Sequence, residues 1–211
     1  MVMPIDDQPI SATLFGESKW LSEFITPKSL EIQELFARIT QKVPNKVDRL
    51  AALGAWVSDE VHYVEFVKAR MWVEGQLSEQ SDMWNEPSIT ARVKVGNCTN
   101  KSFLLASLVR NELPDDAVYC VLGNLHNGEV GGHAWVQVNL NGADYIMETT
   151  VPNGPPLVLA SLAQRYEPVH LFNDRKGYVI EGRTVMQPFS ACYSTWLKEY
   201  LNWAYIEGGG R

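Results

Sequence analysis

Residues 132–150 decide the fold, and they read GHAWVQVNLNGADYIMETT. Strand-favouring Val, Trp, Tyr and Ile recur on both sides of Asn141-Gly142. This dipeptide is favoured in two-residue type I′ turns, because both of its residues accept a positive φ. The stretch therefore predicts two antiparallel strands, 132–140 and 143–150, joined by a tight turn.

Such a turn fixes which residues face each other across the hairpin: Leu140 and Ala143, Val138 and Tyr145, and His133 and Thr150. Glu148 then lies diagonal to His133 on one face, with about 7 Å between their Cβ atoms, which long side chains can bridge. That face is of mixed polarity, and it also carries Trp135, Gln137, Asn139, Asp144 and Ile146. The opposite face is apolar and predicts a core contact through Ala134, Val136, Val138, Leu140, Ala143, Tyr145 and Met147.

Cys98 precedes an apolar segment, 99–110, that predicts a central helix capped by Asn97 or Thr99. The N-terminal end of a helix favours the thiolate form of a cysteine, and the Cys98 N–H can stabilise an oxyanion there. Gly96 permits a close approach of the chain just before the helix. The segment thus has the features of a nucleophile site.

A thiol, an imidazole and a carboxylate are the parts of a cysteine nucleophile, its base and the group that orients the base. Taken alone, a cysteine before a helix is more often an inert buried residue. A histidine or a glutamate on a strand is likewise more often structural. The predicted hairpin favours catalysis because it brings the imidazole and the carboxylate onto one face.

Four segments form a larger pattern: Trp84-Asn85-Glu86-Pro87, Gly96-Asn97-Cys98-Thr99-Asn100, His133-Ala134-Trp135-Val136 and Glu148-Thr149-Thr150. This pattern resembles that of the transglutaminase-like superfamily, which has a papain-like cysteine fold, and in particular its prokaryotic cysteine-protease type. The resemblance covers residues 55–150. It implies an α+β fold in which a central helix, with the cysteine at its N-terminus, packs on an antiparallel sheet, with extra helices at both ends.

The resemblance also implies roles: Cys98 would be the nucleophile, His133 the base and Glu148 the orienting acid. Trp84, Asn97 and Trp135 would line the cleft or assist the oxyanion. The chain departs from the family pattern at two points. The family acid is usually Asp, and the acidic residues that flank the family cysteine are replaced here by Asn97, Thr99 and Asn100.

The reaction implied is acyl transfer, in which the thiolate attacks an amide carbonyl of a peptide or a glutamine side chain and forms a thioester. We expect hydrolysis in preference to transglutaminase-type transfer to an amine. Two alternatives remain at the level of the sequence. One is a non-catalytic peptide-binding domain that keeps the fold. The other is a metal hydrolase that uses Cys98, His126, His133 and Glu148, with His126 also a second candidate proton carrier.

The amino-acid composition limits the class of protein to which the chain can belong. The 211 residues are 45% apolar and include seven Trp, which suits one domain. A net charge of −7 without a basic run argues against nucleic acid or a membrane as partner. Three scattered cysteines and no signal-peptide pattern predict a reducing cytoplasm without disulfides. We expect no cofactor and no metal, and a peptide or protein substrate, while the sequence leaves the oligomeric state open.

Along this single domain we expect an N-terminal arm over 1–25, helices over 26–66, the catalytic core over 67–150, and C-terminal strands and a helix over 151–211. Helices are predicted to begin at Thr26-Pro27 and after Pro44-Asn45. The remaining predictions, in chain order, are an irregular segment at 73–90, a strand at 117–123 beside the hairpin, a movable Gly-rich loop at 124–132, a turn at 152–156, a short helix at 157–166, strands at 168–173 and 177–181, a final helix from Ser190 and a frayed tail at 208–211.

Overall fold

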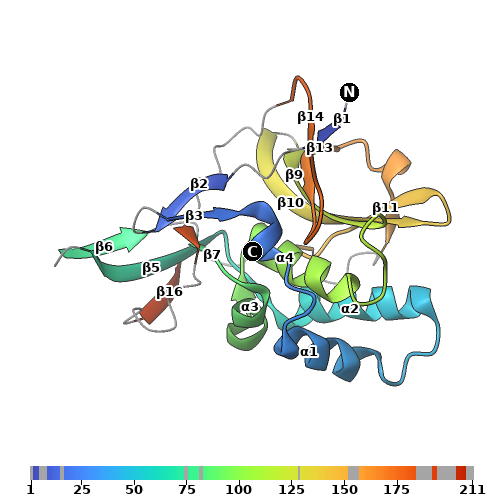
Figure 1. Cartoon of the computed structure of the whole chain (residues 1–211), viewed down its shortest axis with the longest axis horizontal. Coiled ribbons are helices and arrows are strands. Elements are labelled where there is room, and N and C mark those ends of the chain that lie inside the picture. Colours follow the sequence, from blue (N-terminus) through green and yellow to red (C-terminus); the bar gives the residue numbers. More distant parts are fainter. Residues whose placement is uncertain are drawn as a thin grey trace.

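A seven-stranded antiparallel sheet packed on helices forms the centre of the molecule (Figure 1). The computed structural model describes residues 2–4, 9–14, 17–73, 76–80, 83–127, 129–151, 157–183, 192–193 and 203–207. Within these ranges no helix is long and apolar enough to cross a membrane.

The sheet has the strand order β1-β14-β13-β9-β10-β11-β12. Its strands are β1 Val2–Pro4, β9 Val118–Asn127, β10 Glu129–Leu140, β11 Ala143–Met147, β12 Val158–Leu159, β13 Tyr166–Phe172 and β14 Gly177–Ile180. The N-terminal arm contributes β1, which pairs with β14 and forms one edge of the sheet. The predicted strands near 117–123, 168–173 and 177–181 are therefore confirmed.

The helices lie on one face of this sheet. They are α1 Leu30–Thr40, α2 Lys46–Glu60, α3 Pro87–Val93 and α4 Cys98–Val109, with the short 3-10 turn η1 Leu21–Phe24. A second 3-10 turn, η2 Ala160–Leu162, packs against the opposite face of the sheet. In Figure 1, α4 lies between the sheet and the pair α1 and α2. All residues of α4 from Thr99 to Val109 are buried, so α4 is the predicted central helix. The α+β fold class, with this helix on an antiparallel sheet, is confirmed.

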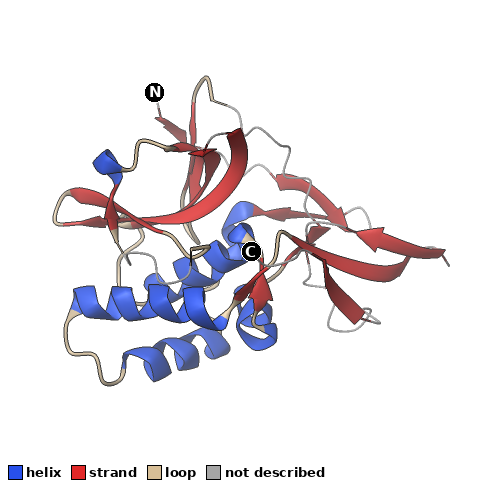
Figure 2. Cartoon of the chain, turned by 180° about the vertical axis from the view of Figure 1, so that it is seen from behind, coloured by secondary structure: helices blue, strands red, loops and turns tan. Residues whose placement is uncertain are grey.

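Further strands extend to one side of the helical layer (Figure 2). One group is the three-stranded sheet of β5 Phe66–Val73, β6 Gln76–Gln80 and β16 Trp203–Glu207. The others are two-stranded: β2 Pro9–Leu14 with β3 Glu17–Trp20, β4 His62–Tyr63 with β8 Val95–Gly96, and β7 Met83–Trp84 with β15 Cys192–Tyr193.

The hairpin of β10 and β11 has the predicted turn. Asn141 and Gly142 both have positive φ, at 54° and 83°, as a type I′ turn requires. Leu140 pairs with Ala143 and Val138 with Tyr145. The expected pairing of His133 with Thr150 is not formed, because β11 ends at Met147. The chain leaves the sheet there, and this frees the Glu148 side chain to turn toward His133.

The two faces of the hairpin pack against different cores. The main core under α4 takes Ala134, Val136, Val138 and Met147. The opposite face, predicted to be of mixed polarity, holds a second and smaller apolar cluster of Val121, Trp135, Ile146 and Ala163. Its apolar members pack together because β9 and the segment after β12 cover them.

Several predicted boundaries are wrong. The first helix begins at Leu30, because the Thr26 N–H donates to Ser107 Oγ (2.9 Å) and residues 26–29 form a turn. Residues 73–90 are not irregular, since they include β6, β7 and α3, and α3 starts on Pro87, a favoured first helical residue. The Gly-rich segment 124–132 is not a loop, because β9 and β10 pair from Glu129 opposite Asn127 onward.

The C-terminal predictions also need correction. The segment 157–166 holds a strand and the single 3-10 turn η2 in place of a helix. The final helix is wrong at the described positions, because 192–193 and 203–207 are strands. Trp, Tyr and Ile dominate there, and they favour strands when another strand is available to pair. The remainder of this prediction, the turn at 152–156 and the tail at 208–211 lie outside the described residues.

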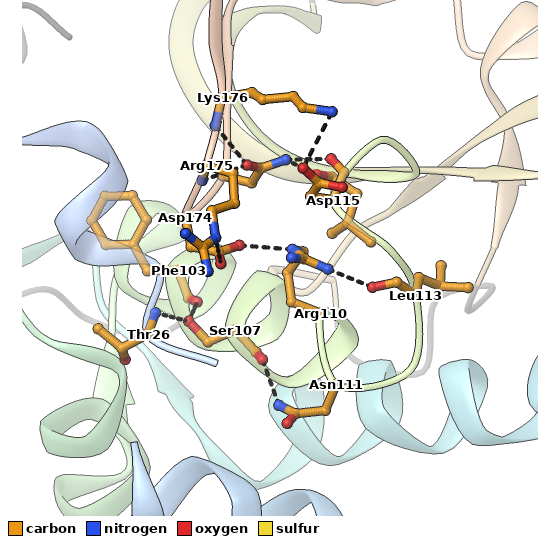
Figure 3. Close-up of polar contacts among 12 residues, drawn as sticks. Thr26, Phe103, Ser107, Arg110, Asn111, Leu113, Asp115, Asp174, Arg175 and Lys176 are labelled. Carbon is orange, nitrogen blue, oxygen red and sulfur yellow. Dashed lines mark hydrogen bonds and ion pairs between the residues drawn. The ribbon is translucent and has the colours of Figure 1, made fainter. Parts of the chain in front are cut away.

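Polar contacts anchor the C-terminal end of α4 (Figure 3). Arg110 Nε donates to Asp174 Oδ1 at 2.7 Å, and Arg110 Nη1 donates to the Leu113 carbonyl at 2.5 Å. Ser107 Oγ accepts from Thr26 N–H and donates to the Phe103 carbonyl at 2.8 Å. These bonds tie the helix to the β13–β14 turn and to the turn at 26–29 before α1, and so fix the position of α4 relative to the sheet.

Candidate active site

Cys98 is the first residue of α4 and is partly exposed. Asn97 is the N-cap, and its side-chain oxygen accepts from the Asn100 N–H at 3.1 Å. A Cβ on Gly96 would lie 2.8 Å from the Asn100 Cβ, so the close approach expected at this glycine is confirmed. The Cys98 N–H belongs to the first turn, whose N–H groups have no acceptor within the helix. It can therefore donate to a group next to the thiol.

His133 and Glu148 form a nearly buried hydrogen-bonded pair. His133 Nε2 lies 2.8 Å from Glu148 Oε2, and the two side chains are 9% and 10% exposed. The hairpin places the two residues diagonally, and the exit of the chain after Met147 lets the carboxylate reach the ring. The imidazole is thus held by the carboxylate in a site with little access for water.

The other side of the imidazole interacts with Cys98. Cys98 acts on the imidazole closely enough to raise the pKa of His133, together with Glu148. Because Nε2 is bound to Glu148, Nδ1 is the ring nitrogen available to the sulfur. The structure therefore brings Cys98, His133 and Glu148 together in this order.

Glu148 accepts five hydrogen bonds. Oε1 accepts from the N–H groups of Thr149 (2.9 Å) and Thr150 (2.8 Å) and from Thr150 Oγ1 (2.7 Å). Oε2 accepts from His133 and from the Tyr166 hydroxyl at 3.0 Å. Burial opposes the negative charge, but the bonds from His133 and Thr150 outweigh it and lower the pKa of Glu148 to about 2. The carboxylate is therefore ionised at neutral pH.

The charge on His133 follows from its two neighbours. Burial disfavours the imidazolium, yet the hydrogen bonds and charges of Cys98 and Glu148 outweigh burial and raise the pKa of His133 to about 10. The imidazolium therefore persists at neutral pH.

A buried ammonium lies one turn further along α4. Lys101 is 1% exposed, and its Nζ donates to the carbonyls of Ser58 (3.1 Å) and Val61 (2.7 Å) at the C-terminal end of α2. Burial lowers its pKa to about 8, against the attraction of Glu148 and Asp59. Lys101 thus joins α4 to α2 and places positive charge within reach of Glu148.

The three residues predicted to line a cleft have different positions. Trp84 is fully buried and packs edge-on against Phe24 and Phe103 at 5.5 and 5.3 Å. Asn97 caps α4 beside Cys98. Trp135 is 1% exposed and stacks at 6.2 Å on the His133 ring. Asn97 and Trp135 therefore adjoin the candidate triad directly, whereas Trp84 lies in the core.

The segment that contains Trp84 was expected to line the cleft or to assist the oxyanion. The Asn85 N–H donates to Asn100 Oδ1 at 2.6 Å, so this N–H group is already engaged. The bond holds the segment against the first turn of α4, next to the Cys98 backbone.

Neither His126 nor Cys120 contacts the His133–Glu148 pair in the described hydrogen bonds. His126 Nε2 lies 3.3 Å from Glu167 Oε2, and its side chain is 48% exposed. Cys120 is fully buried in the main core, and burial raises its pKa well above the usual value. Among the described residues, no group of three or more His, Cys, Asp or Glu side chains is arranged to hold a metal ion.

Reasoning from sequence missed three residues beside the triad: Lys101, Tyr166 and Gly123. Gly123 lies opposite His133, and a Cβ on it would come 2.6 Å from the Trp135 ring. A glycine inside a strand is a signal of such a close approach. Lys101, three residues after Cys98 and therefore on the same side of the helix, carried a similar signal as a charge inside an apolar segment.

An open cavity of about 400 Å³ adjoins the Glu148 end of the triad. Its apolar walls are Ile146, Val151, Val158, Leu162 and Ala163. Glu148, Gln164, Arg165 and Tyr166 supply its polar groups. The volume falls in the range typical of ligand pockets in proteins.

Comparison with known proteins supports the fold. No protein-family model and no curated protein matches the sequence. Among solved structures, LapG of Legionella pneumophila aligns with a TM-score of 0.52 at 15% identity, over 72% of this chain and 77% of that chain. Calcium-bound LapG aligns with a TM-score of 0.50 at 16% identity, over 76% of this chain and 91% of that chain. At these identities the likeness shows the fold alone, and this chain has the transglutaminase-like fold.

Proposed function

We propose that the chain is a cysteine-nucleophile hydrolase of amide bonds, acting on a peptide or on a glutamine side chain. Cys98 is the nucleophile, His133 the general acid and base, and Glu148 the group that orients His133. The observation that carries this proposal is the position of His133, which lies 2.8 Å from Glu148 and whose pKa is raised by Cys98 as well as by Glu148.

The first half of the reaction forms a thioester. The Cys98 thiolate attacks the carbonyl carbon of the amide, and the carbonyl oxygen becomes an oxyanion that accepts from the Cys98 N–H. His133 then gives its proton to the nitrogen of the leaving amine, and the carbon–nitrogen bond breaks. The free amine leaves, while the acyl group stays on the sulfur of Cys98.

The second half releases the acid. His133, now neutral, takes a proton from water, and the resulting hydroxide attacks the thioester carbon. The carbon–sulfur bond breaks, a carboxylic acid leaves, and the thiolate–imidazolium pair returns. An amine in place of water would give transglutaminase-type transfer with the same three residues. The near-complete burial of His133 and Glu148 keeps their interaction strong throughout the cycle.

The cavity beside Glu148 supports a polypeptide substrate with an apolar side chain. Its five apolar walls offer area for such a side chain. The Glu148 carboxylate is already engaged in five hydrogen bonds, so selection in the cavity depends mainly on shape and apolar contact.

Mass spectrometry after incubation with glutamine-containing peptides, with and without an added amine, tests the proposal. Wild-type protein is expected to shorten the peptides or to deamidate the glutamine, and Cys98→Ala is expected to do neither. Amine adducts would assign the transfer reaction. Wild-type protein that leaves every peptide unchanged would contradict the enzyme and favour a peptide-binding domain.

The two histidine–glutamate pairs provide a matched control. His133→Ala is expected to abolish turnover and to slow alkylation of Cys98 by iodoacetamide at pH 6. His126→Ala removes the exposed imidazole 3.3 Å from Glu167 and is expected to leave both rates within two-fold. Equal effects of the two variants would contradict the assignment of His133.

A further inference from the structure

Tyr166 and His133 share one oxygen of Glu148. The Tyr166 hydroxyl donates to Oε2 at 3.0 Å, and His133 Nε2 lies 2.8 Å from the same atom. The three donors from Thr149 and Thr150 all reach the other oxygen, Oε1. Oε1 thus fixes the carboxylate to its own chain segment, whereas Oε2 faces the imidazole and the phenol together.

Packing holds the Tyr166 ring in place. Its centroid lies 5.2 Å from that of Trp135, edge-on at 72°, and 6.2 Å from that of His133. Trp135 in turn stacks on His133 at an interplanar angle of 25°. Gly123, on the strand between β10 and β13, leaves the space that the Trp135 ring occupies. Three rings from β10 and β13 therefore set where the hydroxyl and the imidazole meet the carboxylate.

The charged groups around this contact keep the phenol protonated. Burial, followed by the negative charge of Glu148, raises the pKa of Tyr166 to about 12, against the opposing effect of Arg165. The Arg165 guanidinium lies 5.5 Å from the Tyr166 ring centroid, and Lys101 acts on Glu148 from α4. Tyr166 is therefore a hydrogen-bond donor over the whole range in which His133 titrates.

We propose that Tyr166 is a positioning residue of the triad, which directs Glu148 Oε2 at His133 Nε2 and keeps the shared proton on the imidazole. This inference rests on the proposed function. A second donor to Oε2 lowers the affinity of that oxygen for a proton, so the carboxylate accepts a hydrogen bond from Nε2 without taking the proton itself. It also limits rotation of the carboxylate about its last bond, and so holds the ring that must face the sulfur.

The test compares Tyr166→Phe with Tyr178→Phe. Both variants delete one hydroxyl and keep the ring; Tyr178 pairs with Tyr119 at 5.7 Å, on the β14 side of the sheet. We expect Tyr166→Phe to lower kcat about 10-fold or more while KM stays within two-fold, since hydrogen bonds to charged groups are among the strongest. The ratio of the Cys98 alkylation rate at pH 6 to that at pH 9 is expected to fall in the same variant. Tyr178→Phe is expected to leave kcat and the alkylation ratio within two-fold.

Thr150→Val is the second variant, because it deletes a hydroxyl donor to Oε1, the oxygen that His133 does not contact. We expect a smaller loss of kcat than for Tyr166→Phe. Equal losses in the two variants, or an unchanged alkylation ratio in Tyr166→Phe, would overturn the role of Tyr166. Alkylation of Cys98 needs no substrate turnover, so it also tests the proposed function by itself. If the proposed function is wrong, Cys98 of the wild-type protein is expected to label slowly at pH 6, with or without His133.

Discussion

The two ends of α4 carry buried ion pairs of nearly equal geometry and different chemistry. At the C-terminal end, Arg110 and Asp174 lie 2.7 Å apart and are 11% and 12% exposed. At the N-terminal end, His133 and Glu148 lie 2.8 Å apart and are 9% and 10% exposed. Burial and pairing alone therefore do not distinguish a functional site from a structural one.

The difference lies in what each cation can do next. The Arg110 guanidinium keeps its charge at every ordinary pH, and its bonds run to Asp174 and to the Leu113 carbonyl. His133 can release its proton, and its pKa is raised by the neighbouring, partly exposed Cys98. The N-terminal pair is thus connected to a reactive atom, whereas the C-terminal pair connects elements of the fold. The predictions below test this contrast.

Neutralising the acidic residue of each pair should affect activity at the N-terminal end of α4 and stability at its C-terminal end, and we expect these to be the largest effects. Glu148→Gln keeps the shape of the side chain but removes the charge that supports the imidazolium, and we expect kcat/KM to fall about 10²- to 10³-fold. Asp174→Asn leaves the buried Arg110 without its counter-charge, and we expect a loss of about 3 kcal/mol in the free energy of unfolding. Its kcat/KM should stay within two-fold, because the two ends lie about 18 Å apart along the helix.

Urea unfolding and steady-state kinetics on the two purified variants check both effects. If Asp174→Asn lowered kcat/KM as much as Glu148→Gln at equal folded fraction, the contrast between the ends would be wrong.

The pH dependence of stability should differ between the ends as well. The pKa of His133 is raised from 6.5 to about 10 on folding. Its contribution is therefore complete below pH 6.5 and is lost as the pH rises toward 10. We expect the difference in unfolding free energy between wild type and His133→Gln to shrink by about 3 kcal/mol between pH 6 and pH 9.

The difference in unfolding free energy between wild type and Asp174→Asn should stay constant between pH 6 and pH 9, because an arginine does not titrate in that range. Lys101, whose pKa is lowered to about 8, has the opposite effect, since its neutral form is favoured in the fold. It is present in both proteins of each comparison, so its contribution cancels. A His133→Gln difference that is the same at pH 6 and pH 9 would contradict the imidazolium at the N-terminal end.

The features that the sequence could predict are those set by local patterns of residues. The register of the β10–β11 hairpin next to its turn was predictable, because Asn141-Gly142 admits few turn geometries and one face of the strands is apolar, but the predicted pairing beyond Met147 was wrong. The placement of two residues of the candidate triad, His133 and Glu148, on one face of the hairpin follows from that register. The local sequence pattern also predicted an N-cap for α4 at Asn97 or Thr99, and Asn97 is the cap.

Other features depend on contacts between segments distant in the chain. Tyr166 reaches Glu148 because β13 pairs with β9, across β9 from β10, and no local pattern encodes that order. Lys101 is buried against the carbonyls of Val61 and Ser58 at the end of α2. These residues precede it in the chain by 40 and 43 positions. The strands at 192–193 and 203–207 pair with β7 and β5, so their helical spacing was overridden by available partners.

Removing one side-chain hydrogen bond at each end of α4 should cost similar stability and different reactivity. Asn97→Ala loses the cap that accepts from the Asn100 N–H, and Ser107→Ala loses the bonds to Thr26 and Phe103. We expect each to lower the free energy of unfolding by about 1 kcal/mol. Only Asn97→Ala should slow alkylation of Cys98, because the cap sets the position of the neighbouring sulfur. Equal alkylation rates in both variants would show that the first turn holds its geometry without the cap.

The smallest expected effect concerns the space beside the triad. Ala163 is 8% exposed and lines the cavity at the Glu148 end. Ala163→Leu adds three carbons to a cavity of about 400 Å³, which narrows it without touching the Cys98–His133 contact. If a substrate side chain occupies this cavity, KM for peptides with a bulky apolar residue should rise about 3- to 5-fold, as expected for a change of this size in an apolar pocket. The value of kcat should stay within two-fold, and Ala37→Leu on the exposed face of α1 should change neither constant. Peptides with a small residue at that position should be unaffected, so an equal rise in KM for small and bulky residues would place the substrate elsewhere.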